Sequence, residues 1–365
     1  MIPLFKYYPL LKDKLPHVAL GEFPTPVERL ERLGEDIGAD RLYIKRDDLS
    51  GKVYGGNKIR KLEFILGQAL RSGVKEVLAF GFAGSNHALA TAIYAEKVGL
   101  KSISMLLPQD NAHYVRRNLL MSHYCGAKLH QNRNIPFIAG GTAYQLMRHK
   151  LRNGQFPQII PPGGSSPSGT IGYVNAAFEL KEQVVAGEMP EPDRIYVALG
   201  SMGTAVGLIL GLKAADLKSR VISVRVVDKK YADERKLIKL FHKVNSFLHY
   251  LDLSFKRFEL SEKDIEIRHG FFGQRYALFT EEGMEAVERM EENEGIKLEG
   301  TYTGKTLAGL INDVKKQDLR DKTILFWNTY NSRDFSEKIA DIDYHQLPQC
   351  FHRYFEEEVQ PRDRH

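Results

Sequence analysis

Short apolar runs recur along the chain, and longer segments with helical spacing lie between them. The runs are rich in β-branched and aromatic side chains, which is typical of buried strands. The alternation of strand and helix predicts an α/β fold with parallel sheets that helices cover. The runs lie at 42–44, 77–80, 103–107, 159–160, 195–199, 221–227 and 324–326, and the helical segments at 86–98, 170–185, 203–217 and 281–294.

The chain length indicates more than one domain. Its 365 residues exceed what a single hydrophobic core ordinarily organises, so we expect two domains, or one domain that an insertion divides. Glycine, serine and proline are densest at 161–172, which predicts a hinge. Apolar periodicity is lost from Gln346 onward, which predicts a surface tail.

Composition excludes several classes of protein. With 43% hydrophobic and 27% charged residues, the chain is neither disordered nor fibrous. The two cysteines, Cys125 and Cys350, are too few for a disulfide framework, so we expect a cytoplasmic location. The sequence begins without a secretion signal and has no run of about 18 apolar residues, so we expect no membrane association.

Charge does not favour a nucleic-acid partner. The formal net charge of +6 is spread along the chain except for a basic stretch at 228–244. We interpret that stretch as the solvated face of an amphipathic helix, and the alternative is a surface that attracts a small anionic ligand. His123 and Cys125 lie close in sequence without an accompanying C-x-x-C or H-E-x-x-H motif, so we predict no metal site.

The most informative glycine-rich turn spans 200–204. It follows an apolar run and opens a helix of small residues, so its unpaired amides and the helix dipole would form an anion cradle. The glycine spacing departs from the G-x-G-x-x-G dinucleotide motif and suits a single phosphate monoester. Taken alone, the glycines are equally consistent with close packing of helix on strand. The turn consists of Gly200, Ser201, Met202, Gly203 and Thr204.

A second segment, 300–306, resembles a nucleotide-binding loop only superficially. Its sequence GTYTGKT has three residues between the glycines where a P-loop has four. The preceding segment, 284–294, is charged and helical where a P-loop requires a buried strand. We therefore reject a nucleoside-triphosphate site.

Lys58 is the candidate nucleophile. It follows Gly55-Gly56-Asn57 at a predicted helix start, with Asn57 as the expected N-cap. A helix N-terminus disfavours the positive charge of the lysine and burial adds to this, so its amine would attack a carbonyl readily. An activated lysine and a phosphate cradle together describe the requirements of pyridoxal 5′-phosphate.

These elements belong to a longer match. Four strings, LGEFPTPV (20–27), LYIKRDDL (42–49), GGNKIRKLE (55–63) and YTGK (302–305), resemble the pyridoxal-phosphate enzymes of the tryptophan synthase β fold, fold type II. The resemblance is to the branch that holds 1-aminocyclopropane-1-carboxylate deaminases and D-cysteine desulfhydrases. It implies a two-domain, three-layer αβα architecture and a homodimer. The small domain would be 60–168, and the discontinuous large domain 1–59 plus 169–365.

The resemblance also assigns roles near the cofactor. Lys58 would form the covalent imine with pyridoxal 5′-phosphate and later move protons at the substrate α-carbon. Ser85 would face the reacting carbon, and Asn86 would bond the ring hydroxyl of the cofactor. The amides of the turn that ends at His87 would receive the substrate carboxylate, and Gly164 is also assigned to substrate binding. The phosphate would lie on the turn 200–204, where Met202 stands in place of a usual glycine.

Two tyrosines and two threonines complete the predicted site. Tyr276 and Tyr302 match active-site tyrosines of the branch, although the sequence around Tyr276 matches poorly. Thr303 would lie beside the pyridine nitrogen, where deaminases carry glutamate and desulfhydrases threonine. A hydroxyl there makes the ring a weaker electron sink, which suffices to expel a good β-leaving group. Thr329 is also desulfhydrase-like, so we expect elimination from a small amino acid such as D-cysteine to pyruvate and ammonia.

Departures from the family cluster at the pocket. Asn328-Thr329-Tyr330-Asn331 replaces a His-X-Gly-Gly turn, and Gly84 replaces a glutamine, while the lysine region is intact. This distribution indicates a retained cofactor with altered substrate selection. Two alternatives stay open: a 1-aminocyclopropane-1-carboxylate deaminase, and a non-catalytic protein that binds pyridoxal phosphate or an amino acid.

Overall fold

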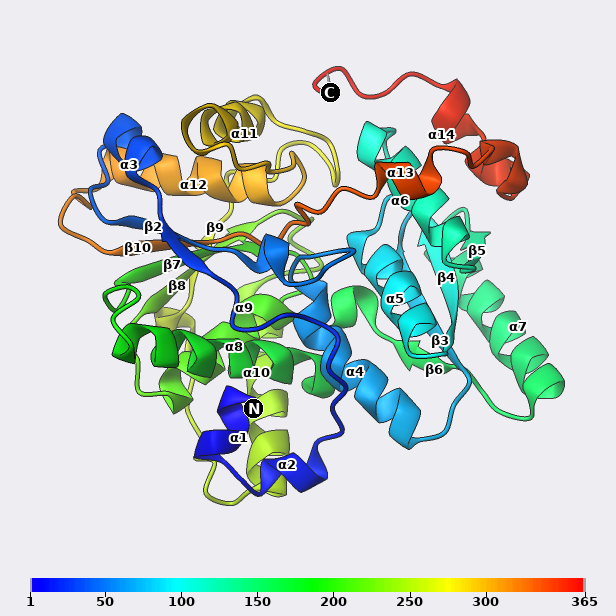
Figure 1. The fold of residues 1–365 in the computed structure, drawn as a ribbon, viewed down its shortest axis with the longest axis horizontal. Helices are drawn as coiled ribbons and strands as arrows, with labels where there is room; N and C mark the ends of the chain where they lie inside the picture. Colours follow the sequence, from blue (N-terminus) through cyan, green and yellow to red (C-terminus); the bar gives the residue numbers. More distant parts are fainter. Residues whose placement is uncertain (1, 364–365) are drawn as a thin grey trace.

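The computed structural model describes residues 2–363, and its strands form two separate sheets (Figure 1). The larger sheet has the order β1-β2-β10-β7-β8-β9, and the smaller has the order β5-β4-β3-β6. Only β1 and β2 pair antiparallel among the described strands, so the predicted parallel α/β architecture is confirmed. The strands are β1 (Val27–Arg29), β2 (Leu42–Lys45), β3 (Glu76–Phe82), β4 (Lys101–Leu107), β5 (Lys128–Gln131), β6 (Gln158–Ile160), β7 (Arg194–Leu199), β8 (Arg220–Arg225), β9 (Glu266–Arg268) and β10 (Ile324–Trp327).

Helices cover the sheets on both faces, which gives the three layers of an αβα fold. α8, α9 and α10 lie against one face of the larger sheet, and α3, α11 and α12 against the other (Figure 1). Within residues 2–363, none of these helices is both long and apolar enough to cross a membrane. The helices are α1 (Pro3–Tyr7), α2 (Leu11–Lys14), α3 (Glu31–Ile37), α4 (Lys58–Arg71), α5 (Asn86–Lys97), α6 (His113–Tyr124), α7 (Ile135–Asn153), α8 (Pro167–Val185), α9 (Gly203–Ala214), α10 (Glu234–Leu251), α11 (Glu281–Glu294), α12 (Thr303–Lys316), α13 (Ser336–Ile339) and α14 (Arg353–Glu356).

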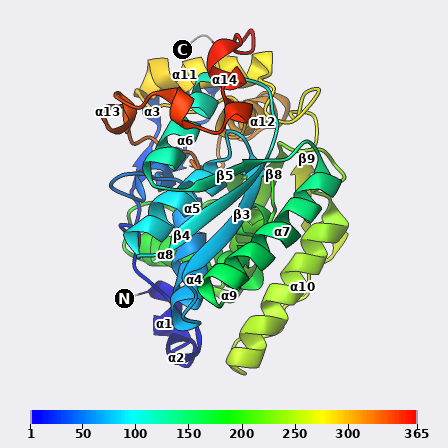
Figure 2. The same cartoon turned by 90° about the vertical axis from the view of Figure 1, so that its right-hand side faces the viewer.

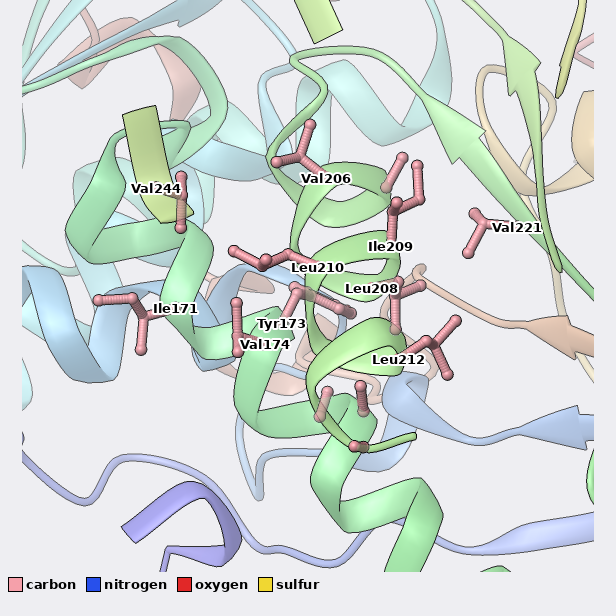
Figure 3. Packing of buried hydrophobic residues seen from close by; sticks show 14 of the residues in the cluster. Ile171, Tyr173, Val174, Val206, Leu208, Ile209, Leu210, Leu212, Val221 and Val244 are labelled. Carbon is pink, nitrogen blue, oxygen red and sulfur yellow. The ribbon is translucent and has the colours of Figure 1, made fainter. Parts of the chain in front are cut away.

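The core of the larger sheet places α9 firmly against α8 (Figure 3). A side chain at Gly207 would put its Cβ 2.4 Å from Cβ of Tyr173, so glycine is required for this approach of the two helices. Leu208 and Val174 are fully buried in the same cluster. This packing holds the first turn of α9 at the carboxyl end of β7, where the glycine-rich turn lies.

The predicted strands are all present, and the strands that were missed are short. β8 ends at Arg225, two residues before the predicted end, and β1, β5 and β9 were not predicted. The segment 161–172 contains a 3₁₀ turn at Pro162–Gly164 and the start of α8 at Pro167, and its role as a hinge stays a prediction. The division into domains at 60 and 168 stays a prediction.

The segment from Gln346 onward lies mostly at the surface, as expected, but buried apolar side chains anchor it to the rest of the protein. Leu347, Phe351 and Tyr354 are all buried, in one cluster with Leu129 of β5 and Phe279. The tail lacks helical spacing because it forms only short helical turns, yet its apolar side chains pack on the smaller sheet and α6. Figure 2 shows α14 beside α6.

Candidate active site

A cavity of about 780 Å³ lies between the two sheets and gathers most of the predicted site residues. Its wall is built from the end of β3, the start of α5, the β7–α9 turn, the loop before α11, the start of α12 and the turn after β10. Gly164, Gly203 and Thr303 do not line it but adjoin residues that do. The predicted residues in the wall are Lys58, Ser85, Asn86, His87, Gly200, Ser201, Met202, Thr204, Tyr276, Tyr302 and Thr329.

Lys58 is the first residue of α4, and its amine faces this cavity. Burial lowers the pKa of Lys58 to about 8, although the nearby Glu299 opposes the shift. Asn57 occupies the N-cap position of α4 as expected, but its side chain makes no cap bond. Instead Asn57 Oδ1 accepts from Lys58 Nζ at 2.8 Å, and its Nδ2 donates to Thr204 Oγ1 at 3.1 Å. Asn57 therefore ties the nucleophile to the glycine-rich turn.

A buried ionic network holds the start of α4 in place. Arg60 Nη2 lies 2.7 Å from Asp47 Oδ1, and Arg60 Nη1 lies 2.8 Å from Glu179 Oε2. Lys45 Nζ completes the group at 2.7 Å from Glu179 Oε1, and each of these side chains is at most 2% exposed. Burial alone would raise the pKa of Asp47, but the adjacent Arg60 holds it below its ordinary value. Displacing any of these paired charges would leave a buried charge without a partner, which is costly. Arg60 therefore fixes the first turn of α4, and with it the backbone of Lys58, two residues earlier in the chain.

The turn before α9 offers unpaired amides to an anion. Met202 adopts φ +68°, a conformation that glycine favours, and the helical ladder begins only with Val206 N donating to Met202 O. Ser165 Oγ lies 2.8 Å from Ser201 Oγ and accepts from Gly203 N at 3.1 Å, so the Gly203 amide is the one amide of the turn 200–204 that these contacts occupy. The positive end of the α9 dipole therefore points at the cavity.

Two buried basic side chains, Lys61 and His87, and the half-buried Lys58 surround the same region, and none has a carboxylate partner among the described residues. Lys61 Nζ contacts only neutral groups, the carbonyl of Gly163 at 3.1 Å and Ser165 Oγ at 3.4 Å. Burial, and then the charge of Lys58, lower the pKa values of Lys61 and His87 well below their ordinary range. Both ring nitrogens of His87 are buried, and within residues 2–363 neither makes a well-formed hydrogen bond, although the backbone of Pro161 is close enough to oppose the fall in the His87 pKa. An anion bound here would accept from these N–H groups and from the free amides of the turn, and its charge would favour the protonated forms of Lys61 and His87. The site therefore fits the phosphate of pyridoxal phosphate.

The start of α5 presents Ser85 and Asn86 to the cavity. Ser85 is the N-cap, with its Oγ accepting from Ala88 N at 3.2 Å. Asn86 Oδ1 accepts from Tyr54 Oη at 3.2 Å and from Asn118 Nδ2 at 2.9 Å. With its oxygen occupied twice, the amide of Asn86 keeps its N–H groups for an acceptor in the cavity.

Two aromatic side chains close the opposite end. The hydroxyl groups of Tyr276 and Tyr302 lie 2.5 Å apart, and the Tyr276 ring packs on Phe82 with ring centroids 4.4 Å apart. Burial raises the pKa of both tyrosines. Both hydroxyls are therefore protonated at neutral pH.

Glu299 is a wall residue that the sequence reasoning missed. Its Oε1 accepts from Tyr302 N at 2.6 Å and Thr303 N at 2.8 Å, and its Oε2 from Thr301 N at 2.8 Å. Thr303 Oγ1 in turn accepts from Glu299 N at 3.0 Å. Burial raises the pKa of Glu299, while the three amides oppose that shift. The sequence signal that could have identified Glu299 is an acidic residue just before an amphipathic helix. For Lys61 and Tyr54, which were also missed, the sequence offers no signal except that they lie near Lys58.

The turn 328–331 closes on the loop that precedes Lys58. Asn331 Oδ1 accepts from Gly55 N at 2.6 Å, and the carbonyl of Thr329 accepts from Asn57 N at 3.1 Å. Gly56 adopts φ +91°, and a Cβ there would lie 2.8 Å from that carbonyl, so only glycine fits. The departure from a His-X-Gly-Gly turn thus supplies new side-chain bonds, and Thr329, Tyr330 and Asn331 all line the cavity.

Comparison with known proteins agrees with this chemistry. A family model described as pyridoxal-phosphate dependent enzyme matches residues 18–329. The chain belongs to this family. As a pyridoxal-phosphate-dependent enzyme it uses the cofactor that Lys58 and the phosphate turn fit, and it acts on small amino acids.

Relatives of this enzyme cover most of its length. A putative 1-aminocyclopropane-1-carboxylate deaminase of Pyrococcus horikoshii is 35% identical over 87% of this chain and 93% of its own. D-Cysteine desulfhydrase of Serratia proteamaculans is 33% identical over 87% of this chain and 96% of its own. The crystal structure of a 1-aminocyclopropane-1-carboxylate deaminase homologue superposes with a TM-score of 0.76 at 33% identity, covering 92% of this chain and 98% of that one. A fungal L-serine ammonia-lyase from Rhizomucor miehei shares the fold, with a TM-score of 0.57 at 19% identity over 94% of this chain and 99% of that one.

Proposed function

We propose that the enzyme catalyses α,β-elimination from a small β-substituted amino acid, with D-cysteine as the representative substrate. The overall reaction would be D-cysteine plus water to pyruvate, ammonia and hydrogen sulfide. The observation that carries this proposal is the residue type at position 303, where this chain has threonine and the deaminases carry glutamate. Thr303 itself is buried just outside the cavity, with its hydroxyl bonded to Glu299. The neighbouring carboxylate, Glu299, has both oxygens occupied by amides of the α12 start. The D-cysteine desulfhydrase relatives support the same choice.

Pyridoxal phosphate, when bound, supplies an electron sink that acidifies the substrate α-carbon. The turn 200–204 and Lys61 would hold its phosphate, and the Asn86 amide would donate to its ring hydroxyl. The Lys58 amine, neutral in part near pH 8, would accept the α-proton. The amides at the start of α5 would receive the substrate carboxylate, because a helix N-terminus favours an anion. Tyr276 and Tyr302 would donate a proton toward the departing β-substituent.

An absorbance spectrum followed by pyruvate assays tests the proposal. Incubation with the cofactor should produce a band at roughly 410–420 nm, where imines of this cofactor absorb, and Lys58→Ala should lack it. The intact protein should release pyruvate from D-cysteine and less from L-cysteine or D-serine. A band without pyruvate from any of these would favour the non-catalytic alternative. Formation of a four-carbon oxo acid from 1-aminocyclopropane-1-carboxylate would favour the deaminase, which the Pyrococcus relatives support as the second candidate.

We also propose the domain division, location and assembly that the sequence predicts. β3, β4, β5 and β6 all fall within 60–168 and the other strands outside it, which supports a small domain there and a large domain of 1–59 plus 169–365. Cys125 and Cys350 are both free, which supports the cytoplasm. The family resemblance alone supports a homodimer, and light scattering of the purified protein tests it.

A further inference from the structure

The C-terminal segment 344–363 runs from the smaller sheet back to the loop that carries Tyr276. Figure 1 shows the end of the chain turning from α14 toward the side of α11. Along the way the Tyr354 carbonyl accepts from Arg116 Nε at 2.6 Å, and the Glu357 carbonyl accepts from Asn111 Nδ2 at 2.8 Å. At its end Asp363 Oδ2 accepts from His113 N at 2.5 Å. The segment is therefore bound to the α6 region on both sides of residue 360.

Gln360 makes the connection to the loop. Its side chain is 7% exposed, and its Oε1 accepts from Phe279 N at 2.7 Å while its Nε2 donates to the Ala277 carbonyl at 3.0 Å. Its backbone N–H donates to the Asn111 carbonyl at 2.9 Å. One amide side chain thus uses both its donor and its acceptor on two backbone groups of the same loop.

The loop needs such support because its backbone is strained. Ala277 has φ +64°, which costs about 1–2 kcal/mol for a residue with a Cβ. On the other side of Tyr276, Arg275 forms a bidentate pair with Asp110, at 2.6 and 2.7 Å. Arg275 is 64% exposed, so this pair holds the loop weakly compared with the buried bonds of Gln360. Tyr276 lies between these two anchors.

We propose that Gln360 is a positioning residue of the active site. It acts through the loop: by fixing Ala277 and Phe279 it keeps the Tyr276 hydroxyl on Tyr302 and the ring on Phe82, at the substrate end of the cavity. The inference rests on the proposed function for its kinetic part only. It makes segment 344–363, which lies beyond the family match at 18–329, a part of the site.

The variant Gln360→Glu tests this with a near-isosteric change. One carboxylate oxygen still accepts from Phe279 N, while the other faces the Ala277 carbonyl with no hydrogen to donate. Gln349→Glu is the matched control, because Gln349 lies on the same segment, is exposed and makes no side-chain hydrogen bond within residues 2–363. In hydrogen–deuterium exchange of the intact protein, the backbone amides of residues 275–280 should exchange at least tenfold faster in Gln360→Glu than in the unaltered protein. The kcat/KM for D-cysteine should fall about tenfold, with the cofactor band unchanged.

A double variant separates positioning from general destabilisation. If Gln360 acts through Tyr276, then Gln360→Glu with Tyr276→Phe should be no slower than Tyr276→Phe alone. Additive losses, or exchange at 275–280 equal to that of Gln349→Glu, would overturn the proposal. If the unaltered enzyme releases no pyruvate, the proposed function fails by itself. In that case two measurements decide the role of Gln360: the amide-exchange comparison, and a spectral titration of the cofactor-loaded protein with D-alanine, which binds without a β-leaving group. An unchanged affinity for D-alanine in Gln360→Glu would contradict the proposal.

Discussion

The hydroxyl oxygens of Tyr276 and Tyr302 lie 2.5 Å apart, so one hydroxyl donates to the other and the second keeps its proton for the cavity. Burial raises the pKa of both groups, so neither ionises at neutral pH. The pair is therefore suited to giving a proton to a leaving group and unsuited to removing one. This division leaves proton removal to the amine of Lys58.

Removing one member of the pair should slow turnover without releasing the cofactor. For Tyr302→Phe we expect kcat for D-cysteine elimination to fall on the order of 100-fold, which is typical of a lost general acid. The cofactor band should be retained. Tyr250→Phe, an 81% exposed tyrosine on α10, is the control and should react normally. A Tyr302→Phe enzyme with unchanged kcat would show that the pair only packs.

Uptake of the cofactor should depend on the protonation of Lys58. The buried amine has a pKa near 8, lowered by desolvation, and only its neutral form attacks an aldehyde. The rate of formation of the 410–420 nm band should therefore rise with pH and level off above about 8. Stopped-flow mixing of cofactor-free protein with the cofactor measures this rate. A rate that keeps rising to pH 10 would mean that Lys58 titrates like an exposed lysine.

The buried network beneath α4 should dominate the acid sensitivity of the fold. Glu179→Gln leaves Arg60 and Lys45 short of a counter-charge and should cost about 3–5 kcal/mol of unfolding free energy in urea titrations. Because Lys45 and Arg60 hold the pKa of Glu179 below its unfolded value, its contribution is present at neutral pH. That contribution is lost as the pH falls below about 4.3.

Glu182 provides the control for that prediction. It lies on the same helix and pairs with Lys6 at the surface, where such pairs contribute about 0–1 kcal/mol. Glu182→Gln should change the unfolding free energy by less than 1 kcal/mol. Equal losses for the two variants would contradict the argument for the buried network.

The phosphate turn carries a strained methionine that glycine should relieve. Met202 has φ +68°, so Met202→Gly should raise the unfolding free energy by about 0.5–1 kcal/mol after the entropy of the unfolded glycine is subtracted. Met202→Ala removes the same side chain but keeps the Cβ, and so should give no gain. Thermal unfolding of the cofactor-free proteins compares them. A gain for alanine equal to that for glycine would assign the effect to the side chain and not to the backbone.

The sequence predicts those parts of the fold that local pattern determines. Long apolar strands such as β4 and β7 are recognisable by themselves, whereas β1 and β9 have three residues each and exist only through pairing with their neighbours. The fold of the lysine region followed from a distinctive string of residues. The burial of the C-terminal segment did not, because it depends on contacts more than 200 residues away.

The same limit explains the site residues that were missed. Lys58 and the turn 200–204 were found because each combines glycines with a helix start. Gln360 contacts Ala277 across 83 positions, and nothing in the flanking residues indicates that pairing. Asn57 is the N-cap residue as expected, but its side chain bonds Lys58 and Thr204 in place of the helix amides, because the folded cavity brings these partners within reach.

The ionic network beside α4 holds Lys58 independently of the segments that would face a substrate side chain. Lys58 rests on a saturated set of buried charges, whereas the surfaces that would face a substrate side chain belong to the turn 328–331 and the Tyr276 loop. Substitutions in those two segments can therefore change the substrate-facing surface without displacing Lys58. An engineer seeking a different leaving group would therefore begin at Thr329, Tyr330 and Tyr276 and leave Arg60 and its partners untouched.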